Sequence, residues 1–410
     1  MIRIIYCYNI VMNINVKQSD YRGAIQQLEK TVYRRGINYG LDHVRAALGQ
    51  LDHPHIGLPP TIHVAGTNGK GSTIAFLEGL LLENGYSVGK YTSPHIETYR
   101  ERIQYNQRQI SARQFAALFT KVSLVDVPLT EFEQLTLMAF CFFQDKQPDF
   151  VLLETGLGGR LDATNVVSPC LSIITSISTD HEVILGDSLA KIAVEKAGII
   201  KANTPAITCP QEADVYQVLK QKADAVEVPL ILAEKANKLP PESPLQAAYQ
   251  AINYGVALAA LKQLKVGLKL PVVGRQVAHW GRFTVIKPSE KASDQRKIII
   301  DVAHNKQGVS VLFETLINQY NVLNPIILCG FFNQKNVSDI LPIIDQHAGK
   351  FYYCEFSKRA HRWDTIKKSV PKSMQWQLGD QFPPGEVIVM TGSHYFISVL
   401  KKRYAGLLGS

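Results

Sequence analysis

The sequence predicts an α/β fold with an N-terminal P-loop-type domain, built on a mostly parallel sheet, and a smaller C-terminal α/β domain. Three observations lead to this prediction. Short Val- and Ile-rich segments alternate with amphipathic segments along the 410 residues, which is typical of parallel strands covered by helices. One strand runs into a glycine-rich turn and a helix within residues 61–85. Helical periodicity is lost between 268 and 283, and a new alternation follows.

The first alternation predicts buried strands separated by helices of ordinary length. Gly85 and Gly198 are placed where each would end a helix. We expect strands over 61–66, 87–92, 150–155 and 170–177, and helices over 72–85, 112–122, 133–143, 188–198 and 247–264.

The second alternation predicts a separate domain of ordinary size. Its expected strands cover 283–286, 297–301, 325–330, 350–356 and 386–392, and its helices lie near 308–319, near 337–347 and at the C-terminus. We therefore expect domains over 1–281 and 282–410. Asn9, Asn13 and Asn15 interrupt the apolar start of the chain, so residues 1–16 are expected to be poorly ordered, with Met12 as a candidate initiator.

Composition excludes several classes of protein. Apolar residues make up 46% and charged residues 19%, which are globular values. No apolar run reaches the length of about 18 residues that a membrane span needs, so we expect a cytoplasmic protein without a membrane partner. Six scattered cysteines without a CxxC pair indicate reduced thiols. The net charge of +9 suits anionic small substrates; it also suits nucleic acid, but the basic residues are dispersed, so no nucleic-acid partner is expected.

The segment HVAGTNGKGST, residues 63–73, predicts a phosphate-binding loop. Backbone N–H groups in such a turn converge on phosphate oxygens, and the helix that follows adds positive potential. The pattern departs from G-x4-G-K-[ST], because Val64 stands at its first position and Gly71 separates Lys70 from Ser72. The residues expected to bind the nucleotide are Gly66, Thr67, Asn68, Gly69, Lys70, Gly71 and Ser72.

Polar residues that end buried strands are further candidates. Glu154, His181 and Asp301 each end or follow one, and carboxyl ends of parallel strands face the crevice where ligands bind. Carboxylate oxygens suit Mg²⁺, which would neutralise charge on a transferred phosphoryl group. Taken alone, Glu154 could instead be a salt-bridged strand end, and His181 a structural histidine.

Several motifs together resemble folylpolyglutamate synthase and the bifunctional dihydrofolate synthase form of the Mur ligase superfamily. These motifs are GTNGKGS at 66–72, TSPHIETYRERI at 92–103, LLETGLGGRLDATN at 152–165, TSISTDHEVILG at 175–186, EKAGIIK at 195–201, GRF at 281–283 and DVAHN at 301–305. The similarity covers about residues 30–400 and follows the order of the family's blocks.

The resemblance implies ATP and two Mg²⁺ ions as cofactors. It implies metal ligands at Ser93, Glu154, His181 and Lys196, the last as a carbamate formed from CO₂. Without it, Lys196 reads as a solvated helical lysine. Lys70, Lys196, His181 and Glu154 would then be the catalytic residues, and Asn253, Arg282 and Asp301 would contact the nucleotide. Phe132 and His304 are candidates for substrate binding, although Phe132 could be a core aromatic, His304 a neighbour of a helix N-cap, and Asn253 a surface amide.

The implied activity is ATP-dependent ligation of L-glutamate to dihydropteroate and to folates through an acyl phosphate, by a monomer. A monofunctional folylpolyglutamate synthase and a peptidoglycan Mur-type ligase are the alternatives; the latter needs an N-terminal domain, for which the roughly 60 residues before the loop are too few. The sequence departs from the family pattern at Trp280, Lys306 and Glu131, and amides at Gln334 and Asn336 replace the usual acids.

Overall fold

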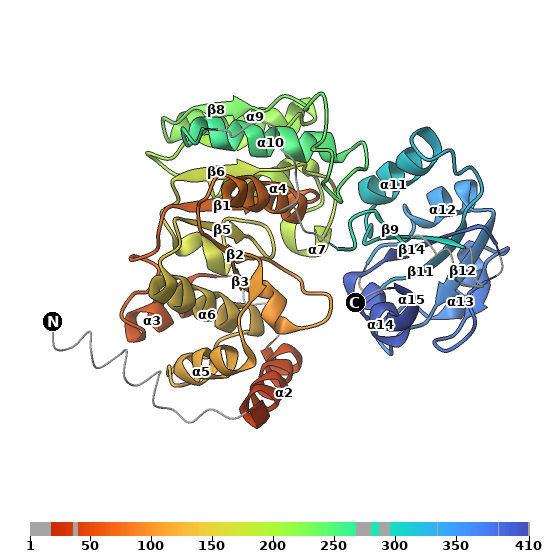
Figure 1. The fold of residues 1–410 in the computed structure, drawn as a ribbon, viewed down its shortest axis with the longest axis horizontal. Coiled ribbons are helices and arrows are strands. Elements are labelled where there is room, and N and C mark those ends of the chain that lie inside the picture. Colours follow the sequence, from red (N-terminus) through yellow and green to blue (C-terminus); the bar gives the residue numbers. More distant parts are fainter. Residues whose placement is uncertain are drawn as a thin grey trace.

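The chain contains two β-sheets, each covered by helices (Figure 1). The computed structural model describes residues 18–35, 40–267, 280–286, 296–333, 335–383 and 385–408. We call the part up to residue 267 the first unit and the part from residue 280 the second unit.

The first unit is built on an eight-stranded sheet in the order β4-β3-β2-β5-β1-β6-β7-β8. The pairs β2/β3 and β3/β4 are antiparallel and the remaining pairs are parallel. Its strands are β1 (Thr61–Ala65), β2 (Val88–Tyr91), β3 (Ile103–Tyr105), β4 (Arg108–Gln109), β5 (Phe150–Glu154), β6 (Leu171–Ile174), β7 (Ala206–Thr208) and β8 (Leu230–Leu232).

Helices bury both faces of this sheet. Its helices are α2 (Gln18–Arg35), α3 (Asp42–Gln50), α4 (Lys70–Glu83), α5 (Ala112–Ser123), α6 (Glu131–Lys146), α7 (Glu182–Leu185), α8 (Leu189–Ala197), α9 (Ala213–Ala225) and α10 (Gln250–Gln263), with short 3₁₀ turns η1 (Tyr99–Arg102) and η2 (Ala163–Val166). Val151 and Leu153 of β5 pack with α2, α3, α5 and α6, whereas Leu152 packs with α4 and α10. Alternate side chains of one strand therefore enter opposite cores, which explains the apolar run of residues 150–153.

The second unit is built on a six-stranded sheet in the order β13-β12-β11-β14-β10-β9, in which only the β9/β10 pair is antiparallel. Its strands are β9 (Thr284–Ile286), β10 (Lys297–Asp301), β11 (Ile326–Gly330), β12 (Lys350–Cys354), β13 (Met374–Trp376) and β14 (Val387–Gly392). Its helices are α11 (Lys306–Asn318), α12 (Leu341–His347), α13 (Trp363–Ser369), α14 (His394–Arg403) and α15 (Ala405–Leu408).

The predicted fold class is confirmed, and several helix starts differ from the prediction. The helix α4 begins at Lys70 instead of 72, and α6 begins at Glu131 instead of 133. The helix α10 begins at Gln250 instead of 247, and α12 begins at Leu341 because residues 338–340 form a turn and Pro342 lies in the first helical turn. Gly198 does follow α8, but with φ of −60°. A side chain there would collide with the backbone of Arg160 at 2.5 Å, so close packing is the reason for this glycine.

Four expectations concern residues that the structure leaves partly undescribed. The segments 1–17 and 268–279 lie outside the described residues, so the order of residues 1–16 and the domain boundary at 281 stay predictions. The five described cysteines are free. No helix among the described residues has the length and apolar character of a membrane span.

Candidate active site

The loop between β1 and α4 has the geometry of an anion site. Gly66 has φ of 152° and Gly69 has φ of 90°, and an added Cβ would lie 1.9 Å from the Thr175 hydroxyl at Gly66 and 2.4 Å from Asn253 Oδ1 at Gly69. Only glycine fits both positions. No side chain caps the start of α4 among the described residues, so its first N–H groups are available for phosphate oxygens.

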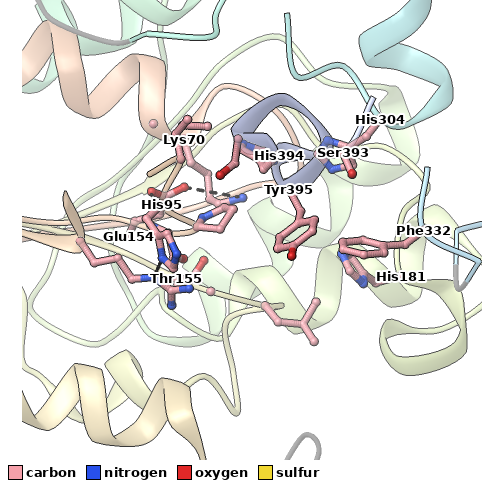
Figure 2. A pocket seen from close by; sticks show the side chains of 18 of the residues that line it. Lys70, His95, Glu154, Thr155, His181, His304, Phe332, Ser393, His394 and Tyr395 are labelled. Carbon is pink, nitrogen blue, oxygen red and sulfur yellow. Dashed lines mark hydrogen bonds and ion pairs between the residues drawn. The ribbon is translucent and has the colours of Figure 1, made fainter. Parts of the chain in front are cut away.

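Lys70 lies at the base of this loop, beside Glu154. The Lys70 ammonium donates to the carbonyls of Gly66 at 3.0 Å and Thr67 at 3.3 Å, and it lies 4.0 Å from the Glu154 carboxylate (Figure 2). Burial lowers the pKa of Lys70 and raises that of Glu154, while the attraction between the two charges offsets part of both shifts. A cation and an acid therefore lie together where phosphates would bind.

The other strand-end candidates converge at the same edge of the sheet. The strands β2, β5, β1 and β6 are neighbours and run parallel, so Ser93, Glu154, the phosphate loop and His181 follow four adjacent strand ends. The backbone N–H of Ser93 donates to Glu154 at 3.1 Å. All of these residues line one cavity of about 860 Å³, so the expected positions lie together, and their roles stay predictions.

Lys196 reaches the phosphate loop from α8. It is 4% exposed, and its ammonium donates to the Gly66 carbonyl at 2.9 Å, so two lysines share one acceptor. Burial, together with the charge of Lys70, lowers the pKa of Lys196 to about 7. The helical lysine that looked solvated in the sequence is therefore a buried amine that loses its proton easily.

A charged cluster joins the two units beside His181. Asp180 lies 3.6 Å from His304 Nε2 and pairs with Lys335, both from the second unit. Burial alone would raise the pKa of Asp180, but the close approach of His304 and the charge of Lys335 hold it well below its ordinary range. Partial burial lowers the pKa of His181 to about 4 against the opposing charge of Asp180, so this imidazole is neutral, as a metal ligand requires.

A second contact links the phosphate loop directly to α11. The Asn68 side chain donates to Asn305 at 3.2 Å and to Gln307 at 2.7 Å, and Asn305 donates back at 3.0 Å. Asn305 also caps α11 by accepting from Gly308 N–H at 2.8 Å. The helix thus begins at Lys306, at the position where the family pattern has proline. The residue that caps it, Asn305, also contacts the phosphate loop.

The three residues expected to contact nucleotide differ in their burial and in their hydrogen-bond partners. Arg282 lines the cavity, 3.3 Å from the His394 ring. Asp301 is buried and accepts from Phe283 N–H at 2.8 Å and from the Tyr249 hydroxyl at 3.1 Å. Asn253 is buried against Gly69 and donates to Gln250 at 2.8 Å.

The far end of the cavity is aromatic and was not predicted from single residues. Tyr21 of α2, Tyr99 and Arg102 line it; the Tyr21 hydroxyl lies 2.6 Å from that of Thr98, and the Arg102 guanidinium lies over the Tyr99 ring at 5.3 Å. Arg102 also lies 3.3 Å from Glu131. Such a group of rings with fixed polar atoms suits a planar heteroaromatic ligand.

Phe132 does not line the cavity itself. Its ring packs 5.9 Å from that of Tyr91, and an added Cβ on Gly156 would lie 2.5 Å from it. Its neighbours Glu131 and Gly156 do line the cavity, so any contact between Phe132 and substrate is still a prediction.

Metal binding at this site needs more than protein acids and imidazoles. Among the described residues no three His, Cys, Asp or Glu side chains cluster closely enough to hold an ion. The set Ser93, Glu154, His181 and Lys196 still fits Mg²⁺, which uses few protein ligands and completes its shell with water and phosphate oxygens. Lys196 fits that set only if carbamylation converts its amine into an oxygen donor.

The chain is similar in sequence and in fold to known proteins. No protein-family model matches it. It is 31% identical over 412 residues to the dihydrofolate synthase/folylpolyglutamate synthase of Bacillus subtilis, covering 90% of this chain and 95% of the relative. The folylpolyglutamate synthase of Mycobacterium tuberculosis, solved with ADP and AMPPCP, has a TM-score of 0.83 at 25% identity, over 95% of this chain and 99% of the other. A bifunctional folylpolyglutamate synthase/dihydrofolate synthase with Mn, AMPPNP and L-glutamate bound has a TM-score of 0.80 at 26% identity, over 93% and 97%.

Proposed function

The chain belongs to the dihydrofolate synthase/folylpolyglutamate synthase family, and we propose that it ligates L-glutamate to dihydropteroate and to folates at the expense of ATP. One observation carries the proposal: the phosphate loop, Lys70 and Glu154 open into a cavity of about 860 Å³ whose other end is aromatic. That cavity accommodates a nucleotide phosphate end and a folate-type acid together. The relative with AMPPNP, Mn and L-glutamate bound supports the same set of ligands.

The reaction begins with attack of the acceptor carboxylate on the γ-phosphorus of ATP, which gives an acyl phosphate and ADP. The amine of glutamate then attacks the acyl carbon, phosphate leaves, and the amine loses a proton as the amide forms. Lys70 and the N-terminal N–H groups of α4 stabilise negative charge on the transferred group. Positioning and charge supply most of the rate in phosphoryl transfer. Both units contribute residues to the cavity in which the reacting groups are positioned.

A divalent ion supplies charge neutralisation on the phosphates when bound. We propose that Ser93, Glu154, His181 and a carbamylated Lys196 hold two such ions. The neutral imidazole of His181 and the buried amine of Lys196, whose pKa is about 7, support this assignment. Carbamylation joins CO₂ to the neutral amine with loss of one proton, and it leaves an anion with two oxygens beside Gly66.

The finer assignments rest on the resemblance to the family, and Arg282 and His304 also line the cavity. We propose that Asn253 reads the base, that Arg282 and Asp301 contact the nucleotide, and that His304 contacts substrate. We also propose that the chain acts as a cytoplasmic monomer without a nucleic-acid partner, with a domain boundary at residue 281.

The proposed function is tested by phosphate release from ATP and Mg²⁺. We expect release that requires glutamate together with either dihydropteroate or a reduced folate, with a product one glutamate heavier by mass spectrometry. Release with only the reduced folate would support the monofunctional alternative. If neither acceptor stimulates phosphate release, the proposal is refuted. The matched control is the same reaction without glutamate.

Replacing Arg282 with alanine is expected to lower turnover by about tenfold or more while changing ATP affinity less. The guanidinium belongs to the second unit and lines the cavity, close enough to influence the pKa values of Lys70 and Glu154 in the first unit. We therefore expect its charge to act on the phosphoryl transfer from the opposite unit. Turnover is measured by phosphate release, and ATP affinity by calorimetry.

The matched control is Arg362→Ala, which removes the same charge from an exposed position of the second unit. An equal loss of ATP affinity and turnover in Arg282→Ala would contradict this role.

A further inference from the structure

We propose that the second unit carries a binding strip for the γ-linked glutamate tail of folate substrates, formed by Arg359, Phe332, Tyr395, Ser398 and Lys402. We call these five residues the rim strip. The inference rests on the proposed function, because a ligase that extends such a tail must bind tails of different lengths. All five residues line the cavity that holds the phosphate loop.

The two walls of the cavity carry different charges. Its described acidic lining residues all come from the first unit, whereas those of the second unit include cations and imidazoles but neither Asp nor Glu. The acidic ones are Glu29, Glu97, Glu131, Glu154 and Asp180, and the basic ones of the second unit are Arg282, Lys335, Arg359 and Lys402. An anionic chain therefore meets less repulsion along the wall of the second unit.

The rim strip is continuous in space. Ser398 and Lys402 lie four residues apart on α14, so they share one helix face with His394. Next to them the Tyr395 ring lies 5.7 Å from that of Phe332, and the Arg359 guanidinium lies over Phe332 at 5.3 Å. Figure 2 shows Tyr395 and Phe332 next to each other at the side of the cavity away from Glu154.

Among the described cations of this wall, two remain available for the tail. Lys335 pairs with Asp180, and Arg282 is the residue that we assign to the nucleotide. By contrast, Arg359 and Lys402 are exposed, and within the described part of the chain neither has a carboxylate partner.

The position of Lys402 is set by its neighbour on the helix. Lys401 is buried, pairs with Glu97 at 2.9 Å and lies over the Trp280 ring at 4.5 Å, which fixes the last turn of α14 against the first unit. Lys402 is thereby held near His95: burial lowers the pKa of that imidazole to about 3, and the charges of Arg102 and Lys402 add to the shift. One end of the rim strip thus reaches the aromatic end of the cavity.

The chemistry of the tail matches this strip. The carboxyl group that reacts must reach the γ-phosphate beside Lys70, so the earlier residues of a long tail lie farther from the phosphate loop. Each of these residues presents one free α-carboxylate. Exposed pairs with Arg or Lys are individually weak and are screened by salt, but two joined contacts reinforce each other. Dihydropteroate has no glutamate and cannot use the strip.

The test compares acceptors in one assay. We would measure kcat/KM for dihydropteroate, tetrahydrofolate monoglutamate and tetrahydrofolate triglutamate in Arg359→Ala/Lys402→Ala. We expect kcat/KM for the triglutamate to fall by about fivefold or more, with a smaller fall for the monoglutamate and a change under about twofold for dihydropteroate. The fall should shrink as salt is raised, and Arg359→Lys/Lys402→Arg should restore the wild-type values. Arg362→Ala/Lys368→Ala removes two exposed charges from the same unit without touching the cavity, and should change none of the three values.

Equal losses on all three acceptors, or no loss on the triglutamate, would overturn the inference while leaving the proposed function in place. Absence of ligation by the wild-type protein with every acceptor would overturn the proposed function and the inference together. Thermal unfolding of each variant establishes that the compared proteins are folded, and both substituted side chains are exposed.

Discussion

Replacing Lys70 with alanine is expected to lower the turnover of ligation by about 100-fold or more, a loss of several kcal/mol of transition-state stabilisation. The Lys70 ammonium is anchored at the turn by two carbonyls, Gly66 at 3.0 Å and Thr67 at 3.3 Å. We expect it to meet the transferred phosphoryl group, and no other side chain of the loop is cationic. Single-turnover phosphate release measures the loss.

The fold should survive this substitution. Burial lowers the pKa of Lys70, which means that the charged amine destabilises the folded state. Its removal eliminates this destabilisation. The carboxylate of Glu154 loses a neighbour and its pKa should rise further. Lys191→Ala serves as the control because it removes an exposed lysine on α8 that pairs with the exposed Asp187. If Lys70→Ala keeps more than about a tenth of wild-type turnover, Lys70 is not the phosphate lysine.

The part of the site that the sequence predicts is the part that is local in the chain. A buried strand, a glycine-rich turn, one lysine and a helix within residues 61–85 predict the phosphate loop, because Gly66 and Gly69 have the positive φ that this turn requires. Glu154 was found for a related reason: an acid directly after an apolar strand lies at the edge of the sheet where ligands bind.

The contacts between the two units could not be predicted in the same way. Asn68 and Gln307 are 239 residues apart in the chain, and Asp180 and Lys335 are 155 apart. A single amide or charge gives no periodic pattern in the sequence from which its partner could be predicted. Its pairing depends on how the two complete units pack against each other. The residues at the aromatic end, such as Tyr21 and Arg102, were missed for the same reason.

Short or polar elements were also missed. The strands β4, β7, β8 and β13 contain only two or three residues, which is too short for an alternating pattern to be read. The helix α2 presents Tyr21 to the cavity and Leu28 to the core, but its sequence is largely polar and includes Gly23, so its periodicity is weak. Tertiary packing against α5 forms this helix.

Replacing Lys196 with alanine is expected to abolish most activity, and small carboxylic acids are expected to restore part of it. At pH 7 an ordinary lysine is neutral in about one molecule in a few thousand, whereas burial brings the pKa of Lys196 to about 7, so a far larger share of this amine can react with CO₂. Because the folded-state pKa is lowered, the neutral amine gains as pH rises through 7. Activation by added bicarbonate should therefore be stronger above pH 7 than below it.

The rescue separates a chemical role of Lys196 from a structural one. Alanine leaves space beside the Gly66 carbonyl, which Lys196 contacts at 2.9 Å, and acetate or formate can place two oxygens there in place of the carbamate. A merely structural lysine would leave a variant that no carboxylate restores, and its loss would appear as a lower thermal midpoint. Mass spectrometry under native conditions provides a second readout, with a carbon dioxide adduct on the wild type that Lys196→Ala lacks and that Lys191→Ala keeps. A bare ammonium at Lys196 in a structure with Mg²⁺, nucleotide and high bicarbonate would contradict the assignment, because every ligand that favours the carbamate would then be present without it.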